Sequence, residues 1–423
     1  MTAPDPQPIA AKLADTRPIP ARLVEPPAAS EVVPARLVHP ADAGPKPPPR
    51  RVGLLRRGGR WIRASVTATF RMASLTVLLA LITAVPALQL VTFGYLLEVV
   101  GRLSRGAALR DSLPWYRHAT RLGMALLAIF LVSLPVHLLT HWSQVARLVD
   151  PQSGAASPLR AAGIAAAVLA MALLAWAWMR GGRLRDYLWP APLRFLGEFW
   201  RPSTWIQAKQ DLWKLFLSLE IPRLFWLGLR GFVGTMIWIT IPAVLLIVAN
   251  REGRGGGAGL LAVLAFLSMG VVLLYLPLLQ ANFAAENRLR AMFQWSAARD
   301  FFRHAPWSWT IAMLLVYALA IPLYLLKIET LPREATWVPC LLFVALMLPA
   351  RVATGLAMRR ARRLPPPRGF FRGLARWTAR LLMPGIVGAY LLAVFLSQYL
   401  DVHGLATWFH QHAVLVPVPF TGT

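Results

Sequence analysis

Long apolar runs alternate with short basic connections along the chain after residue 72. Seven of the runs are long enough to cross a bilayer, whose hydrocarbon core of about 30 Å needs about 20 residues of helix. They lie near residues 122–142, 160–179, 224–249, 259–281, 306–326, 335–357 and 382–400. Hydrophobic residues make up 57% of the chain and charged residues only 15%, which is too apolar for a soluble domain. The pattern predicts an all-α, polytopic integral membrane protein with seven or eight transmembrane segments and interfacial amphipathic helices.

An eighth apolar run, at 72–100, is interrupted by polar residues and by proline. It contains VPALQLVTFGYLLEVVGR, in which Pro86 removes a backbone donor and Gln89 can satisfy freed polar groups. Two half-helices of about 14 residues, each rising about 20 Å, would form a re-entrant hairpin, and a single kinked span is the alternative. In a hairpin, Gln89, Tyr95 and Glu98 would line a polar crevice. These three residues are therefore the candidate pore or substrate contacts.

Two proline-centred phrases of the first half recur in the second. The matching positions, which we take as structural joints, are Pro86 and Pro277, Gln89 and Gln280, and Pro135 and Pro322. The prolines are 49 residues apart in the first half and 45 in the second. This predicts two pseudo-repeats of about 180 to 190 residues whose halves run parallel in the membrane. Such symmetry favours a true span at 72–100.

Basic residues are concentrated in alternate connections. The chain has 45 Lys and Arg against 18 Asp and Glu, and the loops beginning at 101, 180, 282 and 358 hold five, eight, four and eight basic residues. The positive-inside rule predicts a multi-pass protein of the cell membrane with these loops in the cytoplasm and the C-terminus outside. The basic stretch before residue 72 predicts a cytoplasmic N-terminus, which favours the hairpin. The charge indicates attraction to the bilayer and to anionic lipid headgroups, and not to nucleic acid.

Composition divides the chain into six segments. Residues 1–50 hold 13 of the 35 prolines and predict a disordered tail, which repeats one short phrase as PIAAKLA, PIPARLV and VVPARLV. The phrase is either drift in a low-complexity tail or a multivalent docking motif for a protein partner. The other segments are a basic interfacial segment (51–71), a first membrane half with an amphipathic loop at 180–223 (72–223), the fourth span and a linker (224–258), a second half with the last span (259–400) and a C-terminal tail (401–423).

Two smaller patterns predict contacts of the helices. At 364–381 arginines recur every four residues beside aromatic residues, which predicts an interfacial helix. Glycines in two of the apolar runs predict close helix contacts. These glycines are Gly228, Gly231, Gly234, Gly385 and Gly388. Arg230 and Arg351, inside apolar runs, are expected to extend toward the membrane surface.

The sequence contains no standard catalytic motif such as GxSxG or HExxH, so we expect no enzyme activity and no cofactor. The single cysteine, Cys340, excludes an intrachain disulfide. Imidazole groups gather toward the predicted outer side, where they are either a minor candidate for a metal site or interfacial hydrogen-bonding groups. The histidines are His137, His141, His403, His410 and His412.

The order of several residues in the first half resembles a family of prokaryotic membrane domains. The residues that carry the resemblance are Pro86, Gly94, Tyr95, Arg102, Leu113, Pro114, Trp115 and Gly123. The family is uncharacterised and known only as a domain of unknown function. The resemblance covers about residues 72–140 and implies a membrane fold, without an activity or catalytic residues.

Taken together, these patterns favour a non-enzymatic membrane scaffold or adaptor. The repeated tail and the basic interfacial segments are typical of docking to a partner and to lipid. The alternative is a transporter or channel that uses the broken helix around Pro86. A lipid-modifying membrane enzyme is a lesser alternative.

Overall fold

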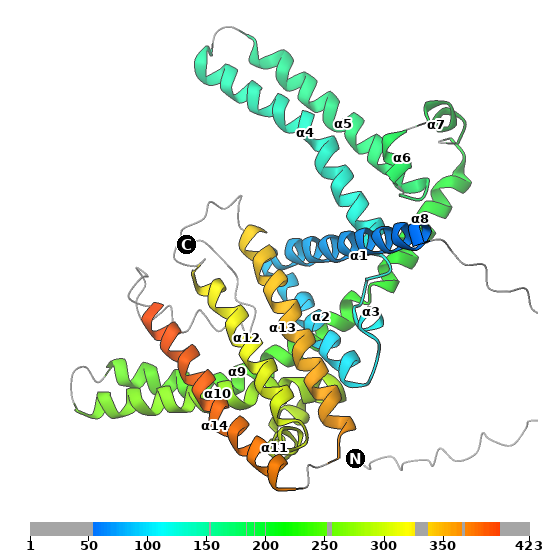
Figure 1. The fold of residues 1–423 in the computed structure, drawn as a ribbon. Coiled ribbons are helices and arrows are strands. Elements are labelled where there is room, and N and C mark those ends of the chain that lie inside the picture. Colours follow the sequence, from blue (N-terminus) through cyan, green and yellow to red (C-terminus); the bar gives the residue numbers. More distant parts are fainter. Residues whose placement is uncertain are drawn as a thin grey trace, which may run out of the picture. The chain divides into compact units, whose positions relative to one another are not determined.

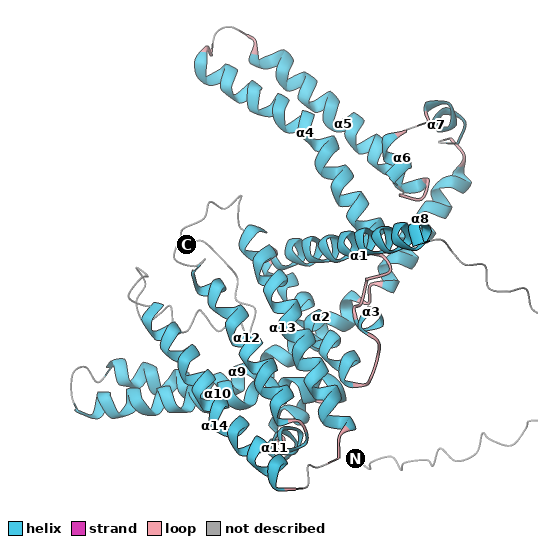
Figure 2. Ribbon diagram, in the orientation of Figure 1, coloured by secondary structure: helices cyan, strands magenta, loops and turns pink. Residues whose placement is uncertain are grey.

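The computed structural model describes residues 54–151, 154–182, 184–189, 191–198, 200–251, 256–325, 337–365 and 369–397. Every regular element within these ranges is a helix, as Figure 2 shows. The predicted N-terminal tail with its three phrases and the C-terminal tail at 401–423 lie outside the described residues. The contacts discussed below lie within one compact unit, Arg60–Thr423.

Eight helical stretches of the described chain are long and apolar enough to cross a membrane. They are Ile62–Thr83, Ala119–Val149, Ala156–Met179, Pro202–Ala249, Gly257–Glu286, Pro306–Leu323, Val338–Arg363 and Gly373–Leu396. Seven of them overlap the seven uninterrupted runs, because a run of about 20 apolar residues can satisfy its backbone in lipid only as a helix. The prediction of an all-α polytopic membrane protein is confirmed.

Helix α2 (Gln89–Ser104) lies at the centre of a bundle (Figure 1). It packs against α9 (Ile221–Arg251), α10 (Gly256–Glu286) and α13 (Trp337–Arg363), and 14 of its 16 residues are buried. Helix α12 (Pro306–Leu325) packs against α13 and against α14 (Phe370–Ser397). With 16 residues, α2 is too short to cross a membrane, and it is buried against α9, α10 and α13.

Glycines bring the backbones of the bundle into contact. A Cβ atom on Gly94 of α2 would lie 1.8 Å from the Leu224 carbonyl oxygen, and one on Gly101 would lie 2.3 Å from that of Ala284. On α9, a Cβ atom on Gly228, Gly231 or Gly234 would likewise lie within 2.5 Å of a neighbouring atom. The predicted close contact of these three α9 glycines is confirmed.

The same prediction is wrong for the glycines of the last span. Apart from the local backbone of α14 itself, no described atom lies within 4 Å of a Cβ position on Gly385 or Gly388. Small residues permit close approach but do not require it. Helix α14 instead packs through larger side chains such as Val387, Tyr390 and Leu391.

Helices α4 (Ala119–Val149) and α5 (Ala156–Met179) lie side by side as a hairpin (Figure 1). Large apolar side chains such as Phe130, Leu131 and Ile164 are exposed along them. Since water would make such exposure costly, these faces indicate contact with lipid. Helix α4 is joined to α1 (Leu54–Thr83) by the hydrogen bond that Arg71 Nε donates to Thr120 Oγ1, at 3.0 Å.

The run at 72–100 is broken where the sequence predicts. Helix α1 (Leu54–Thr83) ends before a 3₁₀ turn, η2 (Pro86–Leu88), and α2 begins at Gln89. Across the break the Thr83 and Thr92 hydroxyl oxygens lie 2.9 Å apart. The two helices are unequal, because α1 continues back through the described part of the basic segment 51–71. Which side of the membrane the N-terminus occupies stays a prediction.

The matching prolines of the first joint lie in different types of secondary structure, and those of the second joint lie in the same type. Pro86 begins the 3₁₀ turn, whereas Pro277 lies inside the continuous helix α10. Pro135 and Pro322 both lie inside helices, α4 and α12. Neighbouring helices can satisfy the carbonyl that a proline leaves without a donor, so both outcomes are possible for one local sequence. The internal repeat stays a prediction.

The two large basic loops are helical. The loop at 180–223 contains α6 (Leu184–Leu188), α7 (Pro192–Glu198) and α8 (Pro202–Ser218). The interfacial helix expected at 364–381 is not separate from the last span, because α14 runs without interruption from Phe370 to Ser397. Between α10 and α12 lie two short elements, η3 (Leu289–Phe293) and α11 (Trp295–His304), and α3 (Leu109–Ser112) follows α2.

Candidate functional site

A buried carboxylate on α2 is surrounded by three guanidinium groups. The Glu98 side chain is 4% exposed, and its Oε1 lies 2.7 Å from Arg102 Nε, 3.2 Å from Arg223 Nη2 and 3.6 Å from Arg105 Nη2. We call these four residues the Glu98 cluster. Arg102 and Arg105 follow Glu98 by four and seven positions and therefore share its helix face. Arg223 comes from the first turn of α9, 125 residues away.

The Glu98 cluster joins three helices. Arg105 Nη1 donates to the carbonyl oxygens of Ala284 and Ala285, at 3.3 and 3.2 Å, at the C-terminal end of α10. A cation at this end is favourable because the last carbonyl groups of a helix carry partial negative charge. Arg223 also pairs with Glu220. The cluster thus fixes α2 against both α9 and α10 at one end of the bundle.

Next to the Glu98 cluster, two aromatic side chains connect α2 with the junction of α8 and α9. The Tyr95 hydroxyl donates to the Pro114 carbonyl oxygen at 2.8 Å, and its ring centroid lies 5.1 Å from that of Trp115. Trp115 Nε1 in turn donates to the Leu219 carbonyl oxygen at 2.7 Å. Trp115 and Glu220 both have left-handed φ angles, 65° and 48°. Residues held in such conformations are frequent at functional sites.

These groups border an open cavity of about 340 Å³, which we call the Trp115 cavity. Its lining includes Arg102, Arg110, Arg117, Asp111, Glu220 and Trp115. Charges of both signs beside an indole ring can bind a polar or zwitterionic group at a membrane surface. We assign the Trp115 cavity no catalytic step.

Two of the three predicted crevice residues belong to this region. Tyr95 and Glu98 are buried and take part in the contacts described above. Gln89 is buried at the other end of α2, nine residues or about 14 Å from Glu98 along the helix axis. The structure therefore does not bring the three side chains together, and their role in transport stays a prediction.

A second polar network lies inside the bundle, and the sequence did not predict it. Arg351 Nη1 donates to Gln280 Oε1 at 2.7 Å, and Gln280 Nε2 donates to Thr235 Oγ1 at 2.9 Å. The Arg351 guanidinium carbon also lies 5.8 Å from the centroid of the Phe93 ring. Arg351 is only 6% exposed, so the expectation that it extends to the membrane surface is wrong. The signal in the sequence was one polar side chain within each of three apolar helices, α9, α10 and α13.

Arg230 fits better the expectation that it extends toward the membrane surface. Its Nη1 and Nη2 donate to the carbonyl and side-chain oxygens of Asn287, at 3.3 and 2.8 Å. Asn287 follows the last residue of α10 with a φ angle of 56°. Arg230 therefore reaches the end of a neighbouring helix and lies outside the buried network.

The histidine candidates are not gathered in the described structure. His137 and His141 are both exposed on α4, and His403, His410 and His412 lie outside the described residues. Within the ranges that the structure describes, no three His, Cys, Asp or Glu side chains form a group that could hold a metal ion. A metal site stays a minor prediction.

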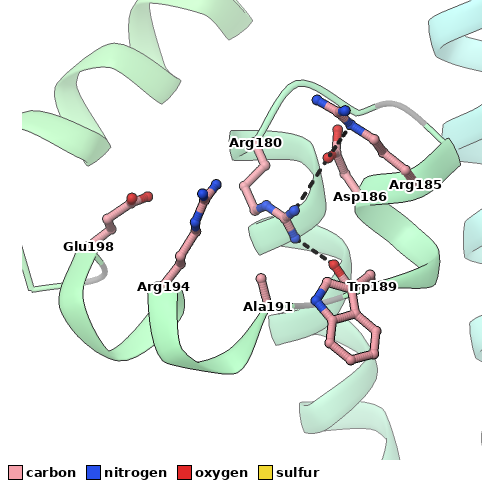
Figure 3. Close-up of a pocket in the computed structure, with 7 residues that line it drawn as sticks. All are labelled: Arg180, Arg185, Asp186, Trp189, Ala191, Arg194 and Glu198. Carbon is pink, nitrogen blue, oxygen red and sulfur yellow. Dashed lines mark hydrogen bonds and ion pairs between the residues drawn. The ribbon is translucent and has the colours of Figure 1, made fainter.

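Figure 3 shows another cavity, of about 710 Å³, in the segment that follows α5. The buried Asp186 carboxylate lies 3.5 Å from Arg180 Nη2 and 3.7 Å from Arg185 Nε, and Arg180 Nη1 donates to the Trp189 carbonyl at 2.6 Å. Burial also raises the pKa of the neighbouring Tyr187 from its usual 10.0, with Asp186 adding to the rise and Arg121 opposing it. These contacts hold the connection between α5 and α7.

Comparison with known protein families matches part of the chain. Residues 216–328 match the model of a family described as "Protein of unknown function (DUF4013)". No curated protein and no solved structure matches the chain. The resemblance to a family of unknown function is thus supported, although the match lies outside residues 72–140. The matched segment contains Leu219, Leu224 and Gly228, which contact Trp115 and Gly94 of the first-half motif. Over these residues the chain is similar to a family without an assigned function.

Proposed function

We propose that this protein is a non-enzymatic membrane scaffold or adaptor. The observation that supports this function best is the fixed position of α2. Its backbone touches that of α9 at Gly94 and that of α10 at Gly101, and the Glu98 cluster joins the same helices. Backbone contacts of this kind leave no space for the helix to slide or rotate. A rigid bundle can hold binding surfaces at constant positions, which is what a scaffold requires.

In this proposal the N-terminal tail recruits a protein partner. Three copies of one short phrase would raise the effective concentration of a weak binding motif. The basic connections would hold the adjoining surface against anionic lipid headgroups on the cytoplasmic side. The cell membrane is the proposed location, with the N-terminus in the cytoplasm and the C-terminus outside.

The first experiment removes the tail from the full chain. Deletion of residues 1–48 should abolish crosslinking of the partner in cells while the protein still reaches the membrane. A matched control keeps the tail length and composition but scrambles the phrases at 8–14, 18–24 and 32–38. Partner capture that survives both changes would contradict the docking role of the tail.

A labelling experiment tests the orientation. Cys340→Ser removes the only cysteine, and Ser30→Cys then places one in the tail. A membrane-impermeant maleimide should label this variant only after lysis. Labelling of intact cells would place the tail outside and would move the search for partners to that side.

A transporter or channel is the second candidate, supported by the buried ionisable groups Glu98 and Arg351 within membrane-embedded helices. The two candidates differ in whether the break at Pro86 must move. In the Cys340→Ser background, Thr83→Cys with Thr92→Cys would allow a disulfide across the break, since the two hydroxyls lie 2.9 Å apart. A scaffold should keep its partner after oxidation. If oxidation abolishes the activity of the protein and a reductant restores it, the transporter or channel is favoured over the scaffold.

A further inference from the structure

A third cavity, of about 440 Å³, lies where α10, α11 and α14 meet. We call it the Arg299 cavity. Aliphatic and aromatic side chains form one part of its lining, among them Leu274, Leu278 and Met383. Arg299, Arg303 and Arg380 form the other part. Among the described residues that line the cavity, none is acidic.

The helices place these arginines together for simple geometric reasons. Arg299 and Arg303 are four residues apart on α11 and therefore share one face of that helix. Helix α11 also carries the large apolar side chains Trp295, Phe301 and Phe302. It is therefore strongly amphipathic, as expected of a helix at the membrane surface. Arg380 comes from the N-terminal part of α14, and its guanidinium carbon lies 5.6 Å from the centroid of the Trp377 ring.

The positive charge of this cavity is largely uncompensated by the described chain. Arg303 has an exposed partner, Asp300, at 3.6 Å. Within the described ranges, no carboxylate lies at ion-pair distance from Arg299 or Arg380. One turn before Arg380, the Nε of Arg376 is buried without a hydrogen-bond partner among the described residues. The cavity therefore favours an anion.

Its position favours a lipid. The cavity lies between two helices that can span the membrane, α10 and α14, and beside an amphipathic one. Tyr275 contacts Trp295 with ring centroids 4.7 Å apart, and such aromatic rings prefer the headgroup level. Arg299 and Arg380 come from two loops that their basic residues predict to be cytoplasmic, where anionic lipids are concentrated.

We propose that the Arg299 cavity binds one anionic phospholipid. Arg299, Arg303 and Arg380 hold the headgroup phosphate, and an acyl chain lies against Leu274, Leu278 and Met383. This inference goes beyond the proposed scaffold function and does not depend on it, because a scaffold or a transporter would use the site equally well. A free phosphate shares the headgroup chemistry, but it would leave the apolar part of the cavity without a ligand.

The test measures lipid binding to the delipidated full-length protein by native mass spectrometry. Phosphatidylglycerol is the probe, with phosphatidylcholine as the zwitterionic comparison and glycerol phosphate as the headgroup without acyl chains. Arg299→Gln with Arg380→Gln should weaken phosphatidylglycerol binding about 25-fold, since each arginine near an anionic headgroup contributes about fivefold. Phosphatidylcholine binding should be weak in all variants, and glycerol phosphate should not compete at equal concentration.

The matched control is Arg288→Gln with Arg290→Gln, which removes the same charge from exposed positions in the same loop. It should change binding by no more than about twofold, because distant exposed charges are screened. An equal loss of phosphatidylglycerol binding in both double variants would show that diffuse surface charge attracts the lipid, and would overturn the proposal. Effective competition by glycerol phosphate would show that the cavity binds a free anion, and would overturn the proposal of a lipid site.

A folding defect is separable from a binding defect. Each variant is first compared with the parent protein in phosphatidylcholine by thermal unfolding, where we expect equal midpoints because the substituted arginines are exposed. If the glutamine pair unfolds early, Arg299→Lys with Arg380→Lys keeps the charge and the aliphatic stem. That pair should bind phosphatidylglycerol more tightly than the glutamine pair, and equal binding would contradict a role for the charge.

Discussion

Gly94 of α2 lies directly against Gly228 of α9. A Cβ atom on either residue would be 2.9 Å from the backbone nitrogen of the other, and each would also press on a carbonyl oxygen, that of Leu224 at 1.8 Å or that of Leu90 at 1.9 Å. The contact is thus reciprocal and made by backbone atoms, which cannot move aside as a side chain can. The contact fixes the distance between α2 and α9, and with it the distance between Glu98 on α2 and Arg223 on α9.

We expect Gly94→Ala or Gly228→Ala to lower the free energy of unfolding by about 3 kcal/mol, because overpacking forces the two backbones apart. Unfolding by SDS in mixed micelles, followed by tryptophan fluorescence, gives this quantity. Gly388→Ala on α14 is the matched control, since no described atom outside the local backbone of α14 lies within 4 Å of its Cβ position. It should be neutral or stabilise by up to about 1 kcal/mol. Equal effects at all three positions would contradict the backbone contact.

Glu98→Gln should destabilise the fold by about 2 kcal/mol, since it leaves three guanidinium groups together without the buried carboxylate. We discount the full cost of breaking a buried ion pair because the three arginine side chains are 29–50% exposed. Asp111→Asn provides the control, because Asp111 pairs with Arg117 at 3.7 Å on the exposed surface. That change should cost less than about 0.5 kcal/mol. A neutral Glu98→Gln would show that the Glu98 cluster does not fix α2.

Tyr95 and Trp115 should be energetically coupled, because their hydrogen bonds hold the same short segment. Tyr95→Phe leaves the Pro114 carbonyl without its donor, and Trp115→Phe does the same for that of Leu219. Each change should cost about 1 kcal/mol, and the double variant should cost less than the sum. Tyr317→Phe loses a similar buried bond, to the Leu273 carbonyl, and should add independently to Trp115→Phe. Full additivity of Tyr95→Phe and Trp115→Phe would show that the segment is held elsewhere.

The spans could be predicted because an apolar run of sufficient length forms a helix in lipid whatever surrounds it. The break at Pro86 was indicated by its proline, but proline alone does not decide the outcome, because Pro277 in the matching sequence lies inside a continuous helix. The length of α1 could not be read in this way. Gly58 and Gly59 argue locally against a helix at 51–71, but a glycine costs only about 1 kcal/mol, and α1 continues through both.

The partners of the charged residues were only partly predictable. The spacing of Glu98, Arg102 and Arg105 places all three on one helix face, so two of the three arginines of the Glu98 cluster were available in the sequence. The third, Arg223, is far away along the chain and is brought there by the packing of α9 on α2. Hydrophobic periodicity also does not predict which way Arg351 points, because both the lipid side and the protein side of its helix are apolar.

The buried network of Arg351 leads to the last prediction. Gln280→Leu removes the acceptor at 2.7 Å from Arg351 Nη1 and the donor to Thr235, so we expect a loss of about 3 kcal/mol. Gln280→Glu keeps an acceptor and adds a negative charge beside the guanidinium group, which should limit the loss to about 1 kcal/mol. Unfolding in mixed micelles gives both values. If Gln280→Leu is the milder change, Arg351 does not depend on Gln280, and the network is not what holds α13 against α10.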